Sequence, residues 1–370
     1  MTAPRVPLVD LREQHAVVRD AVRSGFDRVL EHGRYVLGDE VREFEASFAR
    51  YSGIASCVGV ANGTDALELA LRAADVGPGD EVIVPTNSFI ATALAVARIA
   101  AKPVLVDCTQ DTMLLDVAAA ARALSPRTRA IIPVHLYGQL ADMDGVARLA
   151  HDASLTVIED AAQAQGAAQH GRGPGASSFA AATSFYPGKN LGAYGDGGGV
   201  LTDSADVAAR LRALRNYGSE VKYAHPECGF NSRLDTLQAV VLQAKLAFLD
   251  EWNDARGRAA ARYDALLADL PQVVRPVTSP GNRHVWHLYV VRVPRRDAVL
   301  ARLHEAGIEA GAHYPVPIHL QGAFAALGHR LGDFPVAERA AAEILSLPMF
   351  PQITVEQQER VAAALREALR

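Results

Sequence analysis

Short apolar segments alternate with helix-forming segments from about Ser56 onward. The apolar segments are continuous and rich in β-branched residues, which predicts buried strands: CVGVAN, EVIVPT, KPVLVDC, RAIIPVHL and LTVIEDAA. Between them lie alanine- and leucine-rich stretches that predict helices: TDALELALRAADV, ATALAVARIA, DVAAAARAL and DGVARLAHDA. This alternation predicts an α/β fold, with a mostly parallel sheet covered by helices on both faces.

Helical periodicity also appears on both sides of this block. Apolar residues at helical spacing predict two amphipathic helices before it and one directly after it. The rest of the chain contains one expected strand, HVWHLYVVRV, among further helices. The expected helices outside the block lie at about 13–31, 40–51, 233–249, 296–306, 336–344 and 354–369.

The length of the chain predicts more than one domain. With 370 residues, it exceeds the usual size of a single domain. We expect a large domain with the N-terminal helices at 1–250 and a small C-terminal α/β domain at 251–370. The seam between two domains is a favoured position for a ligand pocket.

Composition narrows the class of protein. Hydrophobic residues make up 49% of the chain and charged residues 21%, which favours a buried globular core. The net charge is −5, and no basic run indicates a nucleic-acid partner. No apolar run approaches the ~18 residues of a membrane span, and no signal core is visible, so we expect a cytoplasmic protein without a membrane partner. Cys57, Cys108 and Cys228 form no CxxC pair, so neither a zinc site nor a disulfide framework is expected.

The stretch SFYPGKNLGAYGDGG places one lysine, Lys189, among small residues. A lysine in a loop is usually only solvated. A lysine framed by glycines is also open to a bulky cofactor, and a desolvated amine loses its proton more readily. The lysine alone does not decide between these two interpretations.

Three further segments favour a cofactor-binding lysine, because each places a chemically useful group at the end of a strand. In ANGTDALELAL, Gly63 and Thr64 open a helix whose N-terminus suits a phosphate, although Thr64 or Asp65 as an ordinary N-cap is an equal alternative. In VIEDAAQAQGA, Asp160 lies where open α/β sheets bind ligands, or caps a helix. In PTNSFIATA, Phe89 either stacks on a flat ligand or belongs to the core.

Pyridoxal 5′-phosphate needs this combination of groups. Its aldehyde needs an amine for a Schiff base, and its phosphate suits a helix N-terminus. The pyridine nitrogen needs an anionic partner, and the ring needs a hydrophobic surface. Lys189, Gly63 with Thr64, Asp160 and Phe89 supply these four requirements.

The chain resembles the nucleotide-sugar aminotransferases that depend on pyridoxal phosphate, the DegT/DnrJ group of fold-type I enzymes, over nearly its whole length. The segments that carry the resemblance are HGRYVLGDEVREFEASFARYSG, ANGTDALELAL, GDEVIVPTNSFIATALA, PVHLYGQLADMD, VIEDAAQAQGA, SFYPGKNLGAYGDGGGVLTD, LRNYGSEVKYAHPECGFNSRLDTLQAVVL, HYPVPIHLQGAF and GDFPVAERAAAEILSLPMFP. Related sugar dehydratases have histidine in place of the lysine, so Lys189 implies transamination.

The resemblance implies a role for individual residues. Lys189 matches the catalytic lysine that holds the cofactor and moves protons, and Asp160 matches the acid facing the pyridine nitrogen. The other implied cofactor contacts are Gln163 at the ring hydroxyl, Phe89 on the ring, and Gly63, Thr64 and Ser184 at the phosphate. Asn231 matches an asparagine that reaches the neighbouring subunit's cofactor, which implies a homodimer with shared active sites.

Two further stretches bear on the identity of the substrate. The stretches NYGSEVKYAH and YPGKNLGAYGDGG are most similar to members that aminate carbon 3 of a dTDP-linked 3-keto-6-deoxyhexose, and the family suggests L-glutamate as amino donor. Amination of a 4-keto sugar is the alternative, and a non-catalytic regulator is a remote one. Expected substrate contacts are Lys222, Tyr223, His225 and Arg233 at the diphosphate, or else an ordinary charged loop, and His313 and Tyr314 at the sugar, or else a rigid turn.

Two other classes of protein fit the sequence poorly. PGKN lacks the residues of a phosphate-binding loop, and GDGGG lacks the GxGxxG spacing. A metal hydrolase would need clustered ligands. His284 and His287 are three apart in an expected strand and so face opposite sides, and we expect no metal site.

Overall fold

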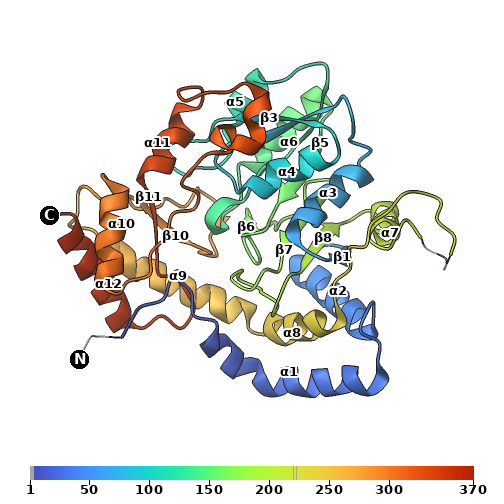
Figure 1. Ribbon diagram of the computed structural model, residues 1–370, viewed down its shortest axis with the longest axis horizontal. Coiled ribbons are helices and arrows are strands. Elements are labelled where there is room, and N and C mark those ends of the chain that lie inside the picture. The colour runs from blue at the N-terminus through green and yellow to red at the C-terminus, as the bar shows by residue number, and fades with distance from the viewer. Residues whose placement is uncertain (1–3, 220, 222) are drawn as a thin grey trace.

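The computed structural model describes residues 4–219, 221 and 223–370 (Figure 1). Its main feature in those residues is a seven-stranded sheet with strand order β1-β8-β7-β5-β4-β2-β3. The strands are β1 (Ser56–Val60), β2 (Glu81–Pro85), β3 (Lys102–Val106), β4 (Thr128–Ile131), β5 (Thr156–Asp160), β7 (Ala180–Ser184) and β8 (Gly198–Thr202). The expected α/β class is confirmed, and the five expected apolar runs form β1 to β5.

Strand direction decides which loops share an edge of this sheet. The β2–β3, β2–β4, β4–β5 and β5–β7 pairs are parallel. β8 is antiparallel to both β7 and β1, so β1 points in the same direction as β7. The carboxyl ends of β1, β2, β5 and β7 therefore meet at one edge.

Helices cover the sheet and extend the N-terminal part. They are α1 (Arg12–His32), α2 (Asp39–Ser52), α3 (Gly63–Ala73), α4 (Ile90–Arg98), α5 (Val117–Arg122), α6 (Met143–Ala153), α7 (Ala205–Leu214) and α8 (Thr236–Leu246), with the short 3₁₀ turn η1 (Leu136–Gly138). Helix α1 packs along α8, and α2 contacts both α8 and β1. Figure 1 shows α1 and α8 side by side. The expected N-terminal helices at 13–31 and 40–51 are confirmed within one residue.

The C-terminal part builds a second core of buried residues. The helices of this C-terminal part are α9 (Leu249–Leu266), α10 (Arg296–Glu305), α11 (Pro335–Glu343) and α12 (Val355–Ala368). Its strands β10 (Tyr289–Arg292) and β11 (Ile344–Leu347) form an antiparallel pair. Its 3₁₀ turns are η2 (Ile318–Leu320) and η3 (Gly322–Leu327). A small pair links β6 (Ala168–Gln169) to β9 (Asn282–Arg283). Val6 joins this second core through a parallel bridge to Ile308. The domain boundary near residue 250 stays a prediction.

Two expected elements differ from the structure. The helix expected at 233–249 is interrupted, because α8 ends at Leu246 and a separate helix starts at Leu249. The expected strand HVWHLYVVRV is wrong in its first half. Residues 284–288 form a loop, since Val285 N donates to Gly138 O (2.8 Å) and Leu288 N to Tyr137 O (3.3 Å) in place of a strand partner.

None of the helices in the described part of the chain is both long and apolar enough to cross a membrane.

Candidate active site

Lys189 lies in a tight turn that follows β7. Its backbone N–H donates to Tyr186 O (2.9 Å), and Ala193 N closes the turn on Phe185 O (2.8 Å). Gly192 is required there, because a Cβ atom at this position would lie 2.3 Å from Pro187 O. The small residues around the lysine are therefore explained by the closeness of the turn as well as by access to the amine.

The amine of Lys189 is poised to lose its proton. Burial lowers its pKa from the ordinary 10.5 to about 8, and the negative charge of Asp160 opposes that shift. The Lys189 ammonium makes no hydrogen bond or ion pair with another described residue. An uncommitted amine with this pKa suits both covalent attachment to an aldehyde and proton transfer near neutral pH.

Asp160 ends β5 and is only 7% exposed. Its carboxylate accepts hydrogen bonds from Thr92 Oγ1 (2.7 Å) and from Ala162 N (3.2 Å). Thr92 Oγ1 also lies 2.7 Å from Ser88 Oγ. Because the single hydroxyl proton of Thr92 goes to the carboxylate, Ser88 must be the donor in the second bond. This relay keeps Asp160 as an oriented acceptor, as a partner for a protonated pyridine nitrogen must be.

Gln163 connects the sheet edge to the C-terminal part of the chain. Its Oε1 accepts from Tyr137 N (2.6 Å), and its Nε2 donates to the Tyr314 hydroxyl (3.1 Å). The Tyr314 ring lies 5.1 Å from the ring of Phe89, centre to centre. Phe89 is 52% exposed and precedes α4, so its ring is available to a flat ligand and is not part of the core.

The start of α3 lies against the end of β7, and the two segments together can bind an anion. The N-cap of α3 is Asn62, whose Oδ1 accepts from Asp65 N (2.8 Å), so the alternative of Thr64 or Asp65 as N-cap is wrong. The N–H groups of Gly63 and Thr64 have no acceptor among the described residues. A Cβ atom on Gly63 would lie 2.7 Å from Ser184 Cβ, so glycine allows these two segments to meet. Two free donors beside a hydroxyl suit a phosphate.

These groups fit pyridoxal phosphate on the evidence of the chain alone. An uncommitted amine, a buried and oriented carboxylate, an exposed aromatic ring and free helix N–H donors all lie at the carboxyl ends of parallel strands of one sheet. In open α/β sheets this edge is where ligands bind. Lys189 would hold the aldehyde, Asp160 the ring nitrogen, and Gly63, Thr64 and Ser184 the phosphate.

The predicted sugar-pocket residues lie beside this site. The Tyr137 hydroxyl donates to His313 O (2.5 Å), and His313 Nδ1 lies 2.8 Å from Ser346 Oγ. Burial, followed by the charge of Asp160, raises the pKa of Tyr314. Tyr314 thus contacts both Gln163 and Phe89, and His313 contacts Tyr137. Contact of His313 and Tyr314 with a sugar stays a prediction.

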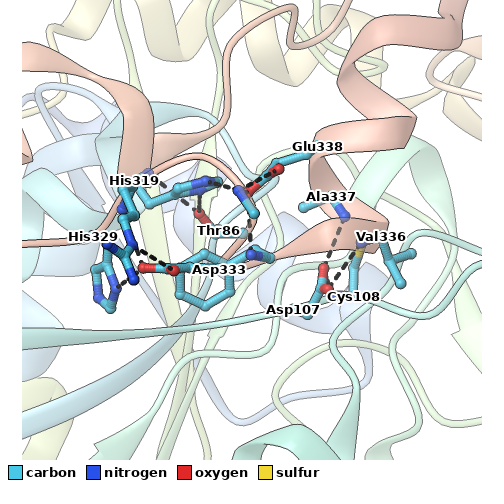
Figure 2. A network of polar contacts seen from close by, with 12 residues as sticks. Thr86, Asp107, Cys108, His319, His329, Asp333, Val336, Ala337 and Glu338 are labelled. Atoms are coloured by element: carbon cyan, nitrogen blue, oxygen red, sulfur yellow. Dashed lines mark hydrogen bonds and ion pairs between the residues drawn. The ribbon is translucent and has the colours of Figure 1, made fainter.

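A polar network fixes the segment that carries these two residues (Figure 2). Ile318 N donates to Thr86 O (2.8 Å), and His319 lies between Thr86 Oγ1 (2.8 Å) and Glu338 Oε1 (3.0 Å). Asp107 accepts from the first N–H groups of α11, Val336 N (3.0 Å) and Ala337 N (2.8 Å). The segment is therefore held at the ends of β2 and β3 by satisfied hydrogen bonds.

Two of the residues predicted for the diphosphate, His225 and Arg233, contact the segment at Asn216 and Tyr217. Arg233 donates to Asn216 Oδ1 (2.9 Å) and lies 5.3 Å from the Tyr217 ring centre, and His225 Nδ1 lies 2.9 Å from Tyr217 O. Asn231 and Tyr223 are exposed, and Lys222 lies outside the described residues. Within one chain, His225, Asn231 and Arg233 form no hydrogen bond or ion pair with Lys189, Asp160 or Gln163. Their roles stay predictions.

Sequence reasoning missed several residues that support the site. Thr92 and Tyr137 orient Asp160 and Gln163. Asn190 is bonded to three other groups, one of them His287. The only signal available was that Asn190 adjoins Lys189, because the partners lie far away in sequence.

The fold and this edge of the sheet define a fold-type I enzyme that depends on pyridoxal phosphate. The chain belongs to the DegT/DnrJ/EryC1/StrS aminotransferase family, whose pattern matches residues 18–366. The resemblance recognised in the sequence is thereby confirmed.

Individual relatives cover almost the whole chain. It is 50% identical to the dTDP-3-amino-3,4,6-trideoxy-alpha-D-glucose transaminase of Streptomyces venezuelae, over 98% of this chain and 96% of that protein. It is 47% identical to the UDP-N-acetyl-3-dehydro-alpha-D-glucosamine 3-aminotransferase of Acidithiobacillus ferrooxidans, over 98% of each. Among solved structures, S. venezuelae DesV in complex with a ketimine intermediate superposes with a TM-score of 0.97 and 50% identity, covering 100% of both chains.

Proposed function

We propose that this aminotransferase converts a dTDP-linked 3-keto-6-deoxyhexose into the 3-amino sugar, with L-glutamate as the amino donor. The observation that carries the proposal is the 50% identity to a dTDP-3-amino-sugar transaminase over nearly the full length of both proteins. The relative that is 47% identical carries a UDP sugar in its name and also specifies position 3. Carbon 3 is therefore better supported than the nucleotide.

The chemistry divides between the cofactor and the chain. Pyridoxal phosphate supplies an electron-withdrawing ring that stabilises negative charge on the substrate carbon. Asp160 would hold the ring nitrogen in its protonated form, because its carboxylate is oriented by Thr92 and Ala162. Lys189, with a pKa near 8, takes up and returns a proton at neutral pH at low cost. We assign Lys189 as the catalytic residue.

The remaining assignments concern binding of the substrate and the cofactor. Tyr314 contacts Gln163, Phe89 and His313, and these four residues would contact the sugar and the cofactor ring. Lys222, Tyr223, His225 and Arg233 would bind the diphosphate, and Asn231 would reach the cofactor of a second subunit in a homodimer. The exposure of Asn231 and Tyr223 in one chain supports contacts made with another molecule.

Identification of the product tests the substrate directly. The purified holoenzyme is incubated with L-glutamate and either the 3-keto or the 4-keto dTDP-6-deoxyhexose, and the product is examined by NMR. The expected result is a new C–N bond at carbon 3 only. Amination at carbon 4 alone would support the alternative, and no amination of either sugar would contradict the proposed substrate class. Lys189→Ala is the matched control, which should leave both sugars unchanged.

A further inference from the structure

Asn190, the residue after the predicted catalytic lysine, is 2% exposed and fully hydrogen-bonded. Its Nδ2 donates to Asn253 Oδ1 (2.7 Å) and to Val285 O (2.9 Å), and its Oδ1 lies 3.0 Å from His287 Nδ1. The three partners come from α9 and from the loop before β10. The position next to Lys189 is thus fixed by a buried side chain, whereas the lysine amine itself is uncommitted.

The direction of these hydrogen bonds follows from the backbone atoms at both ends. Val285 O can only accept, so the atom of Asn190 that faces it must be the amide nitrogen. Asn253 Nδ2 donates to Gln165 O (2.9 Å), which also can only accept, so Asn253 Oδ1 faces Asn190. The oxygen of Asn190 is then left for His287, and His287 Nδ1 must carry the proton.

His287 is neutral in this setting. Burial lowers its pKa well below the ordinary 6.5, and nearby groups that are cationic when protonated add to the shift: Lys189, Arg256, His313 and His284. No carboxylate contributes to that shift. With Nδ1 protonated, the neutral ring leaves Nε2 as an acceptor, and Nε2 makes no hydrogen bond with another described residue.

The backbone of His287 is also held in place. Arg256, on the same face of α9 as Asn253, donates from Nη1 to Met349 O (3.0 Å). The same atom lies at the edge of hydrogen-bond distance from Trp286 O (3.4 Å) and His287 O (3.5 Å). Val285 and Leu288 pair with the Tyr137–Gly138 turn, which contacts Gln163 through Tyr137 N. The loop at 285–288 therefore connects the turn that carries Lys189 (residues 185–193, the lysine turn) to the part of the site near Gln163.

We propose that Asn190 and His287 are positioning residues for Lys189, and that the neutral Nδ1-protonated form of His287, selected by Asn190, is the form that holds the lysine turn. The proposal rests on Lys189 as the cofactor lysine, but not on the identity of the sugar. Neither residue needs to touch the substrate, since both act through the backbone of the turn.

Two substitutions separate positioning from general stability. His287→Asn keeps an N–H donor at the place of Nδ1, whereas His287→Gln moves the donor to the place of Nε2. The rate at which acetic anhydride acylates Lys189 in the cofactor-free protein is measured against pH by peptide mass spectrometry. We expect His287→Asn to match the wild type. His287→Gln should acylate about tenfold more slowly at pH 7, because a displaced lysine is better solvated and keeps its proton.

A matched control uses another buried histidine with a bonded Nδ1. His319→Gln disturbs the network in Figure 2, which contains no hydrogen bond to the lysine turn, and should leave the Lys189 acylation profile unchanged. Equal profiles for wild type, His287→Asn and His287→Gln would overturn the proposal, and so would equal slowing in both His287 variants.

A measurement on the wild type keeps the proposal testable if a variant does not fold. In protein labelled with ¹⁵N-histidine, NMR should show His287 with a protonated Nδ1 and an unprotonated Nε2 from pH 5 to pH 8. A charged ring at pH 7, or a proton on Nε2 alone, would contradict the proposal. Neither experiment uses a keto sugar, so failure here is distinct from failure of the proposed substrate.

Discussion

Lys189 and Lys245 lie in two regions where burial lowers the pKa of a lysine to about 8. Lys245, on α8, is 1% exposed; its ammonium donates to Gly192 O (2.7 Å) and lies 4.6 Å from the centre of the Tyr194 ring. The amine of Lys189 has no hydrogen-bond partner among the described residues. A lowered pKa is common to both lysines, so it is the uncommitted amine at the ligand-binding edge that indicates chemistry.

The two regions are also physically connected. Lys245 holds the carbonyl of Gly192, and Gly192 belongs to the turn that carries Lys189. Asn190 fixes the middle of the same turn. One buried lysine thus supports the segment in which the other is left free, and variants of each should affect different properties.

The largest expected effect is the loss of activity in Lys189→Ala. Turnover should fall by at least about 10³-fold, because no other group in the turn can bond to the aldehyde or transfer the proton. The melting temperature should stay close to that of the wild type, since the lysine amine stabilises nothing in the fold. Steady-state kinetics and thermal unfolding measure the two properties, and full activity in the variant would refute the assignment.

Asp160→Asn should lower turnover by about 10²-fold, because a neutral amide does not keep the pyridine nitrogen protonated. In the cofactor-free protein the same change should speed acylation of Lys189 at pH 7. The charge of Asp160 raises the pKa of Lys189, so its removal lowers that pKa further. Slower acylation in the variant would show that the two groups do not interact as described.

Lys245→Ala should behave in the opposite way to Lys189→Ala. It leaves a cavity and an unpaired Gly192 carbonyl, which should cost about 2–4 kcal/mol of unfolding free energy. Urea denaturation followed by circular dichroism measures this loss. Activity per folded molecule should remain. If the variant were as stable as the wild type but inactive, Lys245 would have the chemical role that we give to Lys189.

The smallest effect is a pH dependence of that stability difference. The pKa of Lys245 is about 8 in the folded chain and about 10.4 in the unfolded chain. Between these values the unfolded chain binds more protons, so this group makes the wild type more stable as pH rises. The destabilisation by Lys245→Ala should therefore grow from pH 8 to pH 10, and a constant difference would contradict the lowered pKa.

Local patterns in the sequence were sufficient to predict the sheet and the main groups of the site. The runs EVIVPT and LTVIEDAA form strands because they are short, continuous and apolar, and Asp160 and Phe89 follow from where such strands end. Lys189 was recognisable from its glycine-rich frame. These features depend on neighbours in the sequence.

The supporting contacts could not be predicted in this way. The bond from Thr92 to Asp160 and the position of Gly63 against Ser184 depend on the order of the strands in the sheet. Residues 284–288 have a strand-like pattern but pair with the turn at Tyr137. In the sequence, Lys245 is typical of an exposed lysine on an amphipathic helix. It is buried because α8 packs beside the turn that carries Lys189.

Chemical trapping of the cofactor tests the central claim most directly. The purified holoprotein is reduced with sodium borohydride, digested and analysed by mass spectrometry for a peptide that carries a phosphopyridoxyl group. The account predicts that the modified residue is Lys189 and that Lys245 is unmodified. Labelling at another lysine, or protein that takes up no pyridoxal phosphate and shows no label, would contradict it.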